Sequence, residues 1–154
     1  MNKCLSNIAL AWALVLVSAS TDAQETGAPA LFRQISVSTG KMITLGEPFN
    51  PAGLAVSVGE GVYSLRPGKF AGAQKLLVVV SADSRVSEMH FIYEEDVSFD
   101  EVVGRYQTRF GQPRALDDAV QGVGVYWEDG HTRLEILRPS ASVPAVSARL
   151  LQRS

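Results

Sequence analysis

A helix with well-marked ends constrains the fold of this chain more than any other feature. Ser98 and Glu101 belong to a capping box, Ser-Phe-Asp-Glu, and Gly111 occupies a position where helices commonly end. The apolar residues between these ends recur at helical spacing on one face: Phe99, Val102, Val103, Tyr106 and Phe110. The pattern predicts one amphipathic helix after Ser98 that buries a single side.

A β-hairpin is predicted immediately before this helix. Lys75–Ser81 is rich in β-branched residues, Val86–Tyr93 alternates, and Asp83-Ser84 between them is a turn signal. If the turn has two residues, Leu77 lies opposite His90. His90 then lies on the sheet face away from the helix, because neighbouring strand residues point to opposite faces.

A second hairpin is predicted after the helix, with its turn at Asp129-Gly130. This dipeptide favours a two-residue type I′ turn, which would pair Trp127 with Thr132. In that register the apolar residues of both strands share one face. Tyr126 and Arg133 then lie on the opposite face.

These segments predict an α+β fold, in which an antiparallel sheet of about five or more strands carries one main helix on one face. The C-terminal core has the order β-β-α-β-β-β, ending in an alternating strand at Val146–Leu150, for which a short helix is the alternative. Frequent glycine and proline before residue 73 indicate short strands and turns, with candidates at Phe32–Ser38, Leu54–Val58 and Val62–Leu65. Residues 31–154 are expected to form a single domain.

The N-terminus has the pattern of a cleavable secretory signal peptide. Lys3 precedes the apolar run Ile8–Val17, and small residues follow as far as Ala23. We expect residues 1–23 to be a signal peptide, with Ala19 as the second choice of cleavage point, and residues 24–30 to be a loose leader. The run is too short to anchor the chain, since ten helical residues cover about 15 Å of a ~30 Å membrane core. The expected location is periplasmic or extracellular.

Several chemistries are poorly supported. Cys4 is the only cysteine, so cleavage would leave no thiol for disulfides, nucleophilic catalysis or metal binding. No phosphate-binding loop and no Gly-x-Ser-x-Gly elbow occurs, and we expect no cofactor. The net charge of −2 and the lack of a basic stripe argue against nucleic acid. No transmembrane segment is expected.

The two histidines and one acidic cluster are the only other candidate groups. A catalytic histidine needs an orienting acid or a nucleophile nearby, and the sequence shows neither, so we expect structural or solvated roles for His90 and His131. The acids from Glu94 to Glu101 suit a helix N-terminus. Neither a catalytic residue nor a metal ligand is predicted.

The sheet face away from the helix is unusually apolar for a solvated surface. It would carry the candidate binding residues Leu77, His90, Ile92, Tyr126 and Arg133. Two alternatives follow. The favoured one is that the N-terminal third, with Phe32, Ile35, Val37 and Phe49, folds across this face. The other is a groove for an envelope protein, a peptide or a lipid.

The stretch from Phe99 to Leu137 resembles the repeat unit of small envelope proteins, which include outer-membrane assembly lipoproteins and secreted β-lactamase inhibitors. Its features are a helix closing on Phe110-Gly-Gln-Pro113 and a hairpin bearing Trp127. The chain lacks the lipid-anchor cysteine of the lipoproteins. The main hypothesis is therefore a non-enzymatic binding domain. The alternatives are a small periplasmic hydrolase, with a carboxylate and a histidine brought together from distant segments, and a structural envelope component. The sequence does not indicate an oligomeric state.

Overall fold

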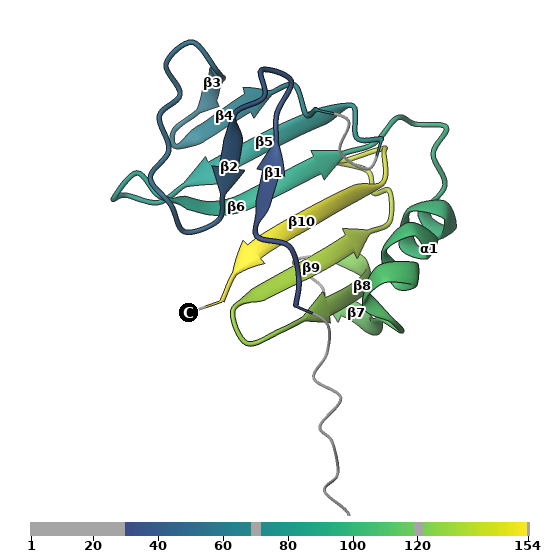
Figure 1. Cartoon of the computed structure of the whole chain (residues 1–154). Coiled ribbons are helices and arrows are strands. Elements are labelled where there is room, and N and C mark those ends of the chain that lie inside the picture. The colour runs from purple at the N-terminus through teal and green to yellow at the C-terminus, as the bar shows by residue number, and fades with distance from the viewer. Residues whose placement is uncertain (1–29, 69–71, 119–121, 154) are drawn as a thin grey trace, which may run out of the picture.

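The computed structural model describes residues 30–68, 72–118 and 122–153 (Figure 1). The predicted signal peptide at 1–23, and the predicted leader up to residue 29, lie outside the described residues. The described elements are, in chain order, β1 (Gln34–Ser36), β2 (Met42–Thr44), β3 (Val56–Gly59), β4 (Val62–Leu65), β5 (Lys75–Val80), β6 (Val86–Ile92), α1 (Phe99–Phe110), β7 (Arg114–Asp118), β8 (Gly122–Glu128), β9 (Thr132–Leu137) and β10 (Ser147–Gln152).

The described part of the chain has an α+β fold in which one helix accompanies an eight-stranded antiparallel sheet, as the sequence predicted in outline. The strand order is β3-β4-β5-β6-β10-β9-β8-β7. The last strand, β10, lies between β6 and β9 and joins the two hairpins into one sheet (Figure 1). Within the described ranges, no helix is both long enough and apolar enough to span a membrane.

Strand β7 was not predicted, so the core after the helix has four strands and not three. Arg114–Asp118 pairs with β8 at the edge of the sheet, where Leu116 lies opposite Gly124. Leu116 is its only buried residue among those whose side chains are described. With a single buried residue, the strand has no alternation of apolar and polar residues from which the sequence could predict it.

The helix begins and ends where its capping residues predict. The Ser98 Oγ accepts a hydrogen bond from the Glu101 N–H at 3.2 Å. Gly111 has φ of 78°, a left-handed conformation that glycine adopts without steric cost. Val102, Tyr106 and Phe110 form the buried side. Local sequence therefore determines this element almost completely.

The register of the first hairpin is confirmed, although its turn differs. Leu77 lies opposite His90, as predicted. The loop has three residues, because Ser81 N–H donates to the Arg85 carbonyl and Ser84 has φ of 61°. A bulge between Val79 and Val80 absorbs the extra residue and restores the expected pairing beyond it.

The predicted register of the second hairpin is wrong. Trp127 lies opposite Leu134 and not Thr132. A type I′ turn needs positive φ at both central residues, and neither Asp129 nor Gly130 has it. Instead, Asp129 Oδ1 accepts the backbone N–H groups of His131 and Thr132, each at 2.8 Å, and holds a four-residue turn. The shift between partners is two residues, so each side chain keeps its predicted face.

The N-terminal third covers the same face of the sheet as α1, contrary to the favoured prediction. In Figure 1 the β1–β2 hairpin and α1 both lie in front of the sheet. The Phe32 ring lies 6.2 Å from Tyr106, 6.1 Å from Phe110 and 6.5 Å from Phe91. Ile35 of β1 belongs to the same core. The sequence could not distinguish the two faces, because both carry apolar residues.

Candidate functional site

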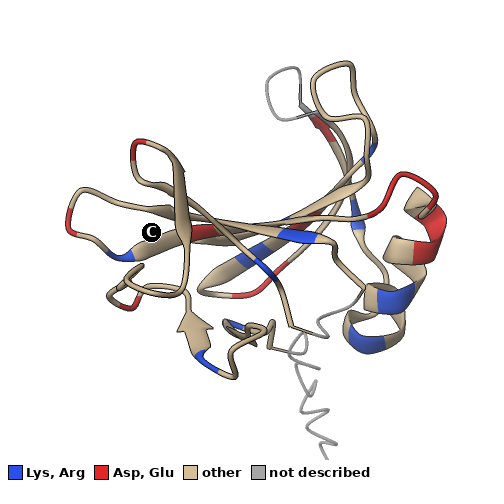
Figure 2. Cartoon of the chain, turned by 90° about the horizontal axis from the view of Figure 1, so that it is seen from above, with Lys and Arg blue, Asp and Glu red and all other residues tan. Residues whose placement is uncertain are grey.

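The opposite face, which we call the open face, carries a row of side chains in register. Leu77 lies opposite His90, His90 opposite Arg149, Arg149 opposite Glu135, and Glu135 opposite Tyr126. The row therefore crosses β5, β6, β10, β9 and β8. Figure 2 shows acidic and basic residues, in red and blue, along the strands of the sheet.

Three members of this row form a continuous polar chain with Glu88 and Arg133, which we call the charged ladder: His90, Glu88, Arg149, Glu135 and Arg133. His90 Nε2 lies 2.7 Å from Glu88 Oε2, and Arg149 Nη2 lies 3.4 Å from the same oxygen. On its other side, Arg149 Nη1 lies 3.5 Å from Glu135 Oε2. Arg133 Nε lies 2.9 Å from Glu135 Oε1. With neutral histidine, two carboxylates balance two guanidinium groups.

Glu135 is the most buried member of the charged ladder. Its side chain is only 2% exposed, whereas those of Arg133 and Arg149 are 29% and 19% exposed. Its contacts with both arginines are ion pairs and not aligned hydrogen bonds, because Glu135 Oε2, Arg133 Nε and Arg149 Nε have no hydrogen-bond partner among the described residues. Removing either cation would leave this buried carboxylate with less charge compensation.

Glu88 is held in its ionised form. The hydrogen bond with the His90 ring, together with the nearby Arg149 guanidinium, keeps the pKa of Glu88 below its ordinary value of 4.5, although partial burial opposes this. The His90 ring makes no other hydrogen bond within the described ranges. The pair is therefore integrated into the charged ladder.

The five predicted binding residues, Leu77, His90, Ile92, Tyr126 and Arg133, form what we call the five-residue patch. Leu77 and His90 are neighbours, and Ile92 follows His90 along β6, opposite Ser147. The Arg133 guanidinium lies 4.0 Å from the centroid of the Tyr126 ring, a cation–π contact. Leu77, His90 and Ile92 therefore form one half of the patch, on β5 and β6. Tyr126 and Arg133 form the other half, on β8 and β9, and strand β10 lies between the two halves.

Arg149 and Glu135 connect the two halves of the five-residue patch. Glu135 lies on this face because it is two residues beyond Arg133 along β9. Sequence reasoning missed Arg149, because its position depends on β10 lying between β6 and β9. The only signal was the alternation of Arg149 with Ala148 and Leu150, which predicted a strand but not its neighbours.

Apolar side chains surround the charged ladder. Leu77, Val79, Ile92, Leu137 and Leu151 are all half-buried. The adjacent strand residues that point to the other face are almost fully buried, with Leu76, Val78 and Phe91 at 0% exposure. The β1–β2 hairpin and α1 lie on the other side of the sheet (Figure 1). The described part of the chain leaves this semi-apolar surface accessible.

The geometry gives little support to catalysis. A cavity of about 510 Å³ is lined by Glu88, Ser81 and Ser87, but not by His90. The Ser87 hydroxyl donates to the Val79 carbonyl at 3.1 Å, so this hydroxyl is engaged in the fold. Within the described ranges, no three histidine, cysteine, aspartate or glutamate residues group as metal ligands would.

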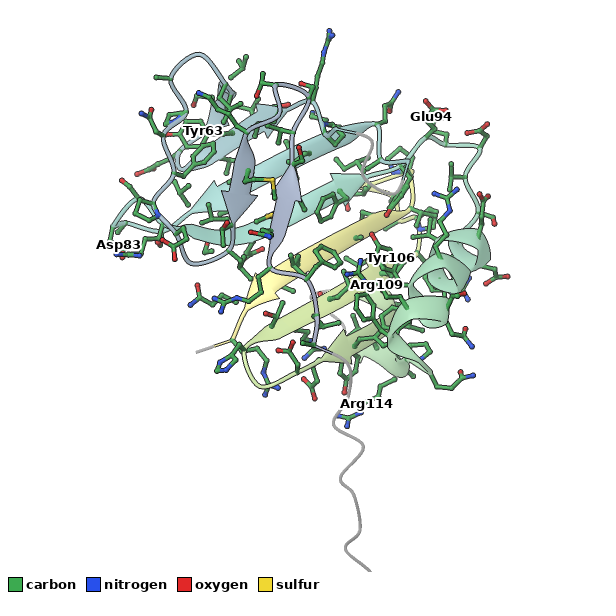
Figure 3. All side chains as sticks on the ribbon, in the orientation of Figure 1. Tyr63, Asp83, Glu94, Tyr106, Arg109 and Arg114 are labelled. Carbon is green, nitrogen blue, oxygen red and sulfur yellow. The ribbon has the colours of Figure 1, made fainter. Side chains whose placement is uncertain are left out.

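The remaining candidate groups lie apart from the open-face row. His131 is exposed beside the β8–β9 turn. Glu94 lies in the exposed segment that leads into α1 (Figure 3), and Asp100 and Glu101 occupy the first turn of that helix. These acids therefore suit the positive end of the helix dipole.

The fold and this face define a small α+β domain whose sheet is covered on one side and open on the other. No family model, curated protein or solved structure matches this chain. The resemblance to small envelope proteins therefore stays a prediction, and the functional argument depends on the geometry of the described residues.

Proposed function

We propose that this chain is an exported, non-enzymatic binding domain that holds an extended segment of an envelope protein or peptide on its open face. The observation that carries this proposal is the accessible semi-apolar surface around Leu77 and Ile92. Apolar area of this kind gains free energy when a partner removes it from water, at about 25 cal/mol per Å². Sheet faces of single domains are usually polar when they remain in water.

The charged ladder supports specificity more than affinity. Its carboxylates and guanidinium groups already balance one another, so a partner gains little from simple charge attraction. Tyr126 and Arg133, by contrast, are of the residue types that dominate binding energy at interfaces. We therefore expect Tyr126, Leu77 and Ile92 to contribute most of the affinity, while the charged ladder discriminates between partners.

A pull-down from envelope extract tests the proposal. The bait is the protein purified from export of the full chain, compared with its Tyr126→Ala and Leu77→Lys variants. Met42→Ala is the matched control, because Met42 is exposed on β2, in the layer on the other side of the sheet. We expect both open-face variants to lose proteins that wild type and Met42→Ala recover. Identical recovery by all four baits would exclude the open face.

A lipid partner is the main competing outcome. Vesicles of zwitterionic and anionic composition, floated with the wild-type protein, distinguish it from a protein segment. Flotation that Leu77→Lys abolishes would replace the proposed partner with a membrane surface.

A small hydrolase is the second candidate function, and it is supported by the close approach of His90 and Glu88. A histidine oriented by a carboxylate is one half of a nucleophile-activating arrangement. A panel of chromogenic ester, phosphate and glycoside substrates tests it. Turnover that His90→Gln removes would favour the enzyme over the binding domain.

Export itself has a direct test. Cleavage after Ala23 would give a mature protein that begins at Gln24, which N-terminal mass analysis of secreted material detects. A secreted product that retains Met1 would contradict the signal peptide.

A further inference from the structure

A cavity lies at one corner of the sheet, outside the five-residue patch. It lies where β3 begins, β4 ends and β5 begins, and has a volume of about 530 Å³. Leu54, Val56 and Leu65 supply its apolar lining. Arg66 and Lys75 supply two cations. Its size is typical of sites for small groups.

The two cations of this cavity are not balanced by any acid. Neither Arg66 nor Lys75 forms an ion pair within the described ranges, and no aspartate or glutamate lines the cavity. Leu65 lies opposite Leu76, and Arg66 and Lys75 are the chain neighbours of these two paired residues. Like charges that line one cavity disfavour the fold, which a bound anion would relieve.

Three other cavities show the contrast. Each is lined by a cation together with an acid: Arg85 with Glu88, Arg114 with Glu128, and Lys41 with Glu47. The corner cavity is therefore distinguished by its charge and not only by its volume. Its charge is complementary to a carboxylate.

Strand β3, at the edge beside this cavity, lacks the usual protection of edge strands. None of its residues is charged, and Val56 and Val58 are 69% and 55% exposed. The opposite edge strand, β7, carries Arg114 and Asp117 instead. Exposed apolar edges favour pairing with another extended chain.

We propose that this corner binds the free C-terminal carboxylate of an extended peptide that adds to the sheet antiparallel to β3. The inference rests on the proposed binding function and names a ligand class for it. The corner site uses residues outside the five-residue patch. An experiment can therefore exclude the corner site without excluding the open face, and the reverse.

The orientation follows from the topology. A strand antiparallel to β3 runs from the Gly59 end toward Val56, and its last residue ends beside the cavity that Val56 lines. A parallel strand would begin there and bring its terminal ammonium against Arg66 and Lys75. The bulge between Ser57 and Gly59 limits regular pairing to the Val56 end, so the last residues of the peptide carry the recognition.

The test uses fluorescein-labelled pentapeptides with serine at alternate positions and Val, Ile, Leu, Phe or Ala at the last and third-from-last positions. Each is made as the free acid and as the C-terminal amide, and binding to the protein is measured by fluorescence anisotropy. We expect the free acids to bind at least about tenfold more tightly, as a charge-assisted contact would give. Amide-proton exchange in β3 should slow on binding at the N–H groups that point away from β4.

Three variants complete the experiment. The double variant Arg66→Gln/Lys75→Gln should abolish the preference for the acid, whereas Lys41→Gln, which removes an exposed cation elsewhere, should keep it. Equal binding of acid and amide, or no binding by any pentapeptide, would overturn the proposal. Binding of inorganic phosphate alone would also overturn it, by reducing the corner to a simple anion site. Tyr126→Ala should leave pentapeptide binding intact even if it abolishes the pull-down.

Discussion

Replacing Arg149 by methionine should destabilise the protein more than its partial exposure suggests. Among the described residues, Arg149 is the only cation that contacts both Glu88 and Glu135, at 3.4 Å and 3.5 Å. Methionine preserves much of the aliphatic packing on β10 but removes the charge. Glu88 still has His90, whereas Glu135 retains Arg133 alone.

The magnitude follows from the burial of Glu135. Removing one partner of a buried ion pair typically costs 3–5 kcal/mol, because it leaves a charge without compensation. Arg133 remains 2.9 Å from Glu135, so we expect a smaller loss, about 2–3 kcal/mol. Glu135→Gln should cost only about 1 kcal/mol, because the arginines that it leaves behind retain access to water.

Urea unfolding followed by far-UV circular dichroism measures these free energies. The double variant Arg149→Met/Glu135→Gln contains no unpaired buried carboxylate, and should lose about 1–2 kcal/mol less than the sum of the two single losses. Arg153→Met is the matched control, since Arg153 is 47% exposed and pairs with Glu128 at 3.2 Å. Its loss should stay within about 1 kcal/mol. Strict additivity, or equal losses for Arg149→Met and Arg153→Met, would refute the reasoning.

Three further predictions concern pH and two glycines. The lowered pKa of Glu88 stabilises the folded protein above about pH 4.5, and this contribution is lost as the pH falls through the folded-state pKa. His90→Gln removes the main cause of the lowered pKa. Its free energy of unfolding in urea should therefore be below that of wild type at pH 6, and the difference should shrink below pH 4. A persistent deficit at pH 3 would contradict this cause. Gly104→Ala should stabilise by about 1 kcal/mol, because Gly104 is exposed within α1 and an added Cβ meets nothing within 4 Å. Gly124→Ala should lower the thermal midpoint sharply, because its Cβ would lie 2.0 Å from the Ile136 carbonyl oxygen; an unchanged midpoint would show that β8 can shift.

Local signals predicted the parts of this fold that local interactions determine. Ser98 and Gly111 predicted the ends of the helix, and the turn signal at Asp83-Ser84 led to the pairing of Leu77 with His90, although the loop has one more residue than assumed. The turn at Asp129 was misjudged because the Asp-Gly dipeptide suggests a type I′ turn, whereas the carboxylate of Asp129 also accepts the N–H of Leu31 at 2.7 Å. That contact joins residues far apart in the chain, so no local pattern could contain it.

In the candidate site, too, local patterns predicted some features, whereas others depend on residues far apart in the chain. Hairpin alternation placed all five residues of the five-residue patch on the open face, because facing depends only on parity along each strand. The link through Arg149 depends on strand order, which is a property of the whole sheet. The choice of face covered by the N-terminal third was wrong for a related reason. Phe32 can pack on either apolar surface, and only the complete core, with Tyr106 and Phe110, decides between them.

The two proposed sites should respond differently to salt. The charged ladder is neutral overall and its ions are paired, so binding to the five-residue patch depends mainly on apolar contact and should change little with ionic strength. Arg66 and Lys75 are exposed and unbalanced, so their attraction for a carboxylate should weaken as the Debye length falls from about 10 Å at 0.1 M salt to about 3 Å at 1 M. Pentapeptide affinity should therefore fall severalfold over this range, while recovery of envelope partners persists. Loss of both with salt would mean that charge attraction, and not the burial of Leu77 and Ile92, holds partners on the open face.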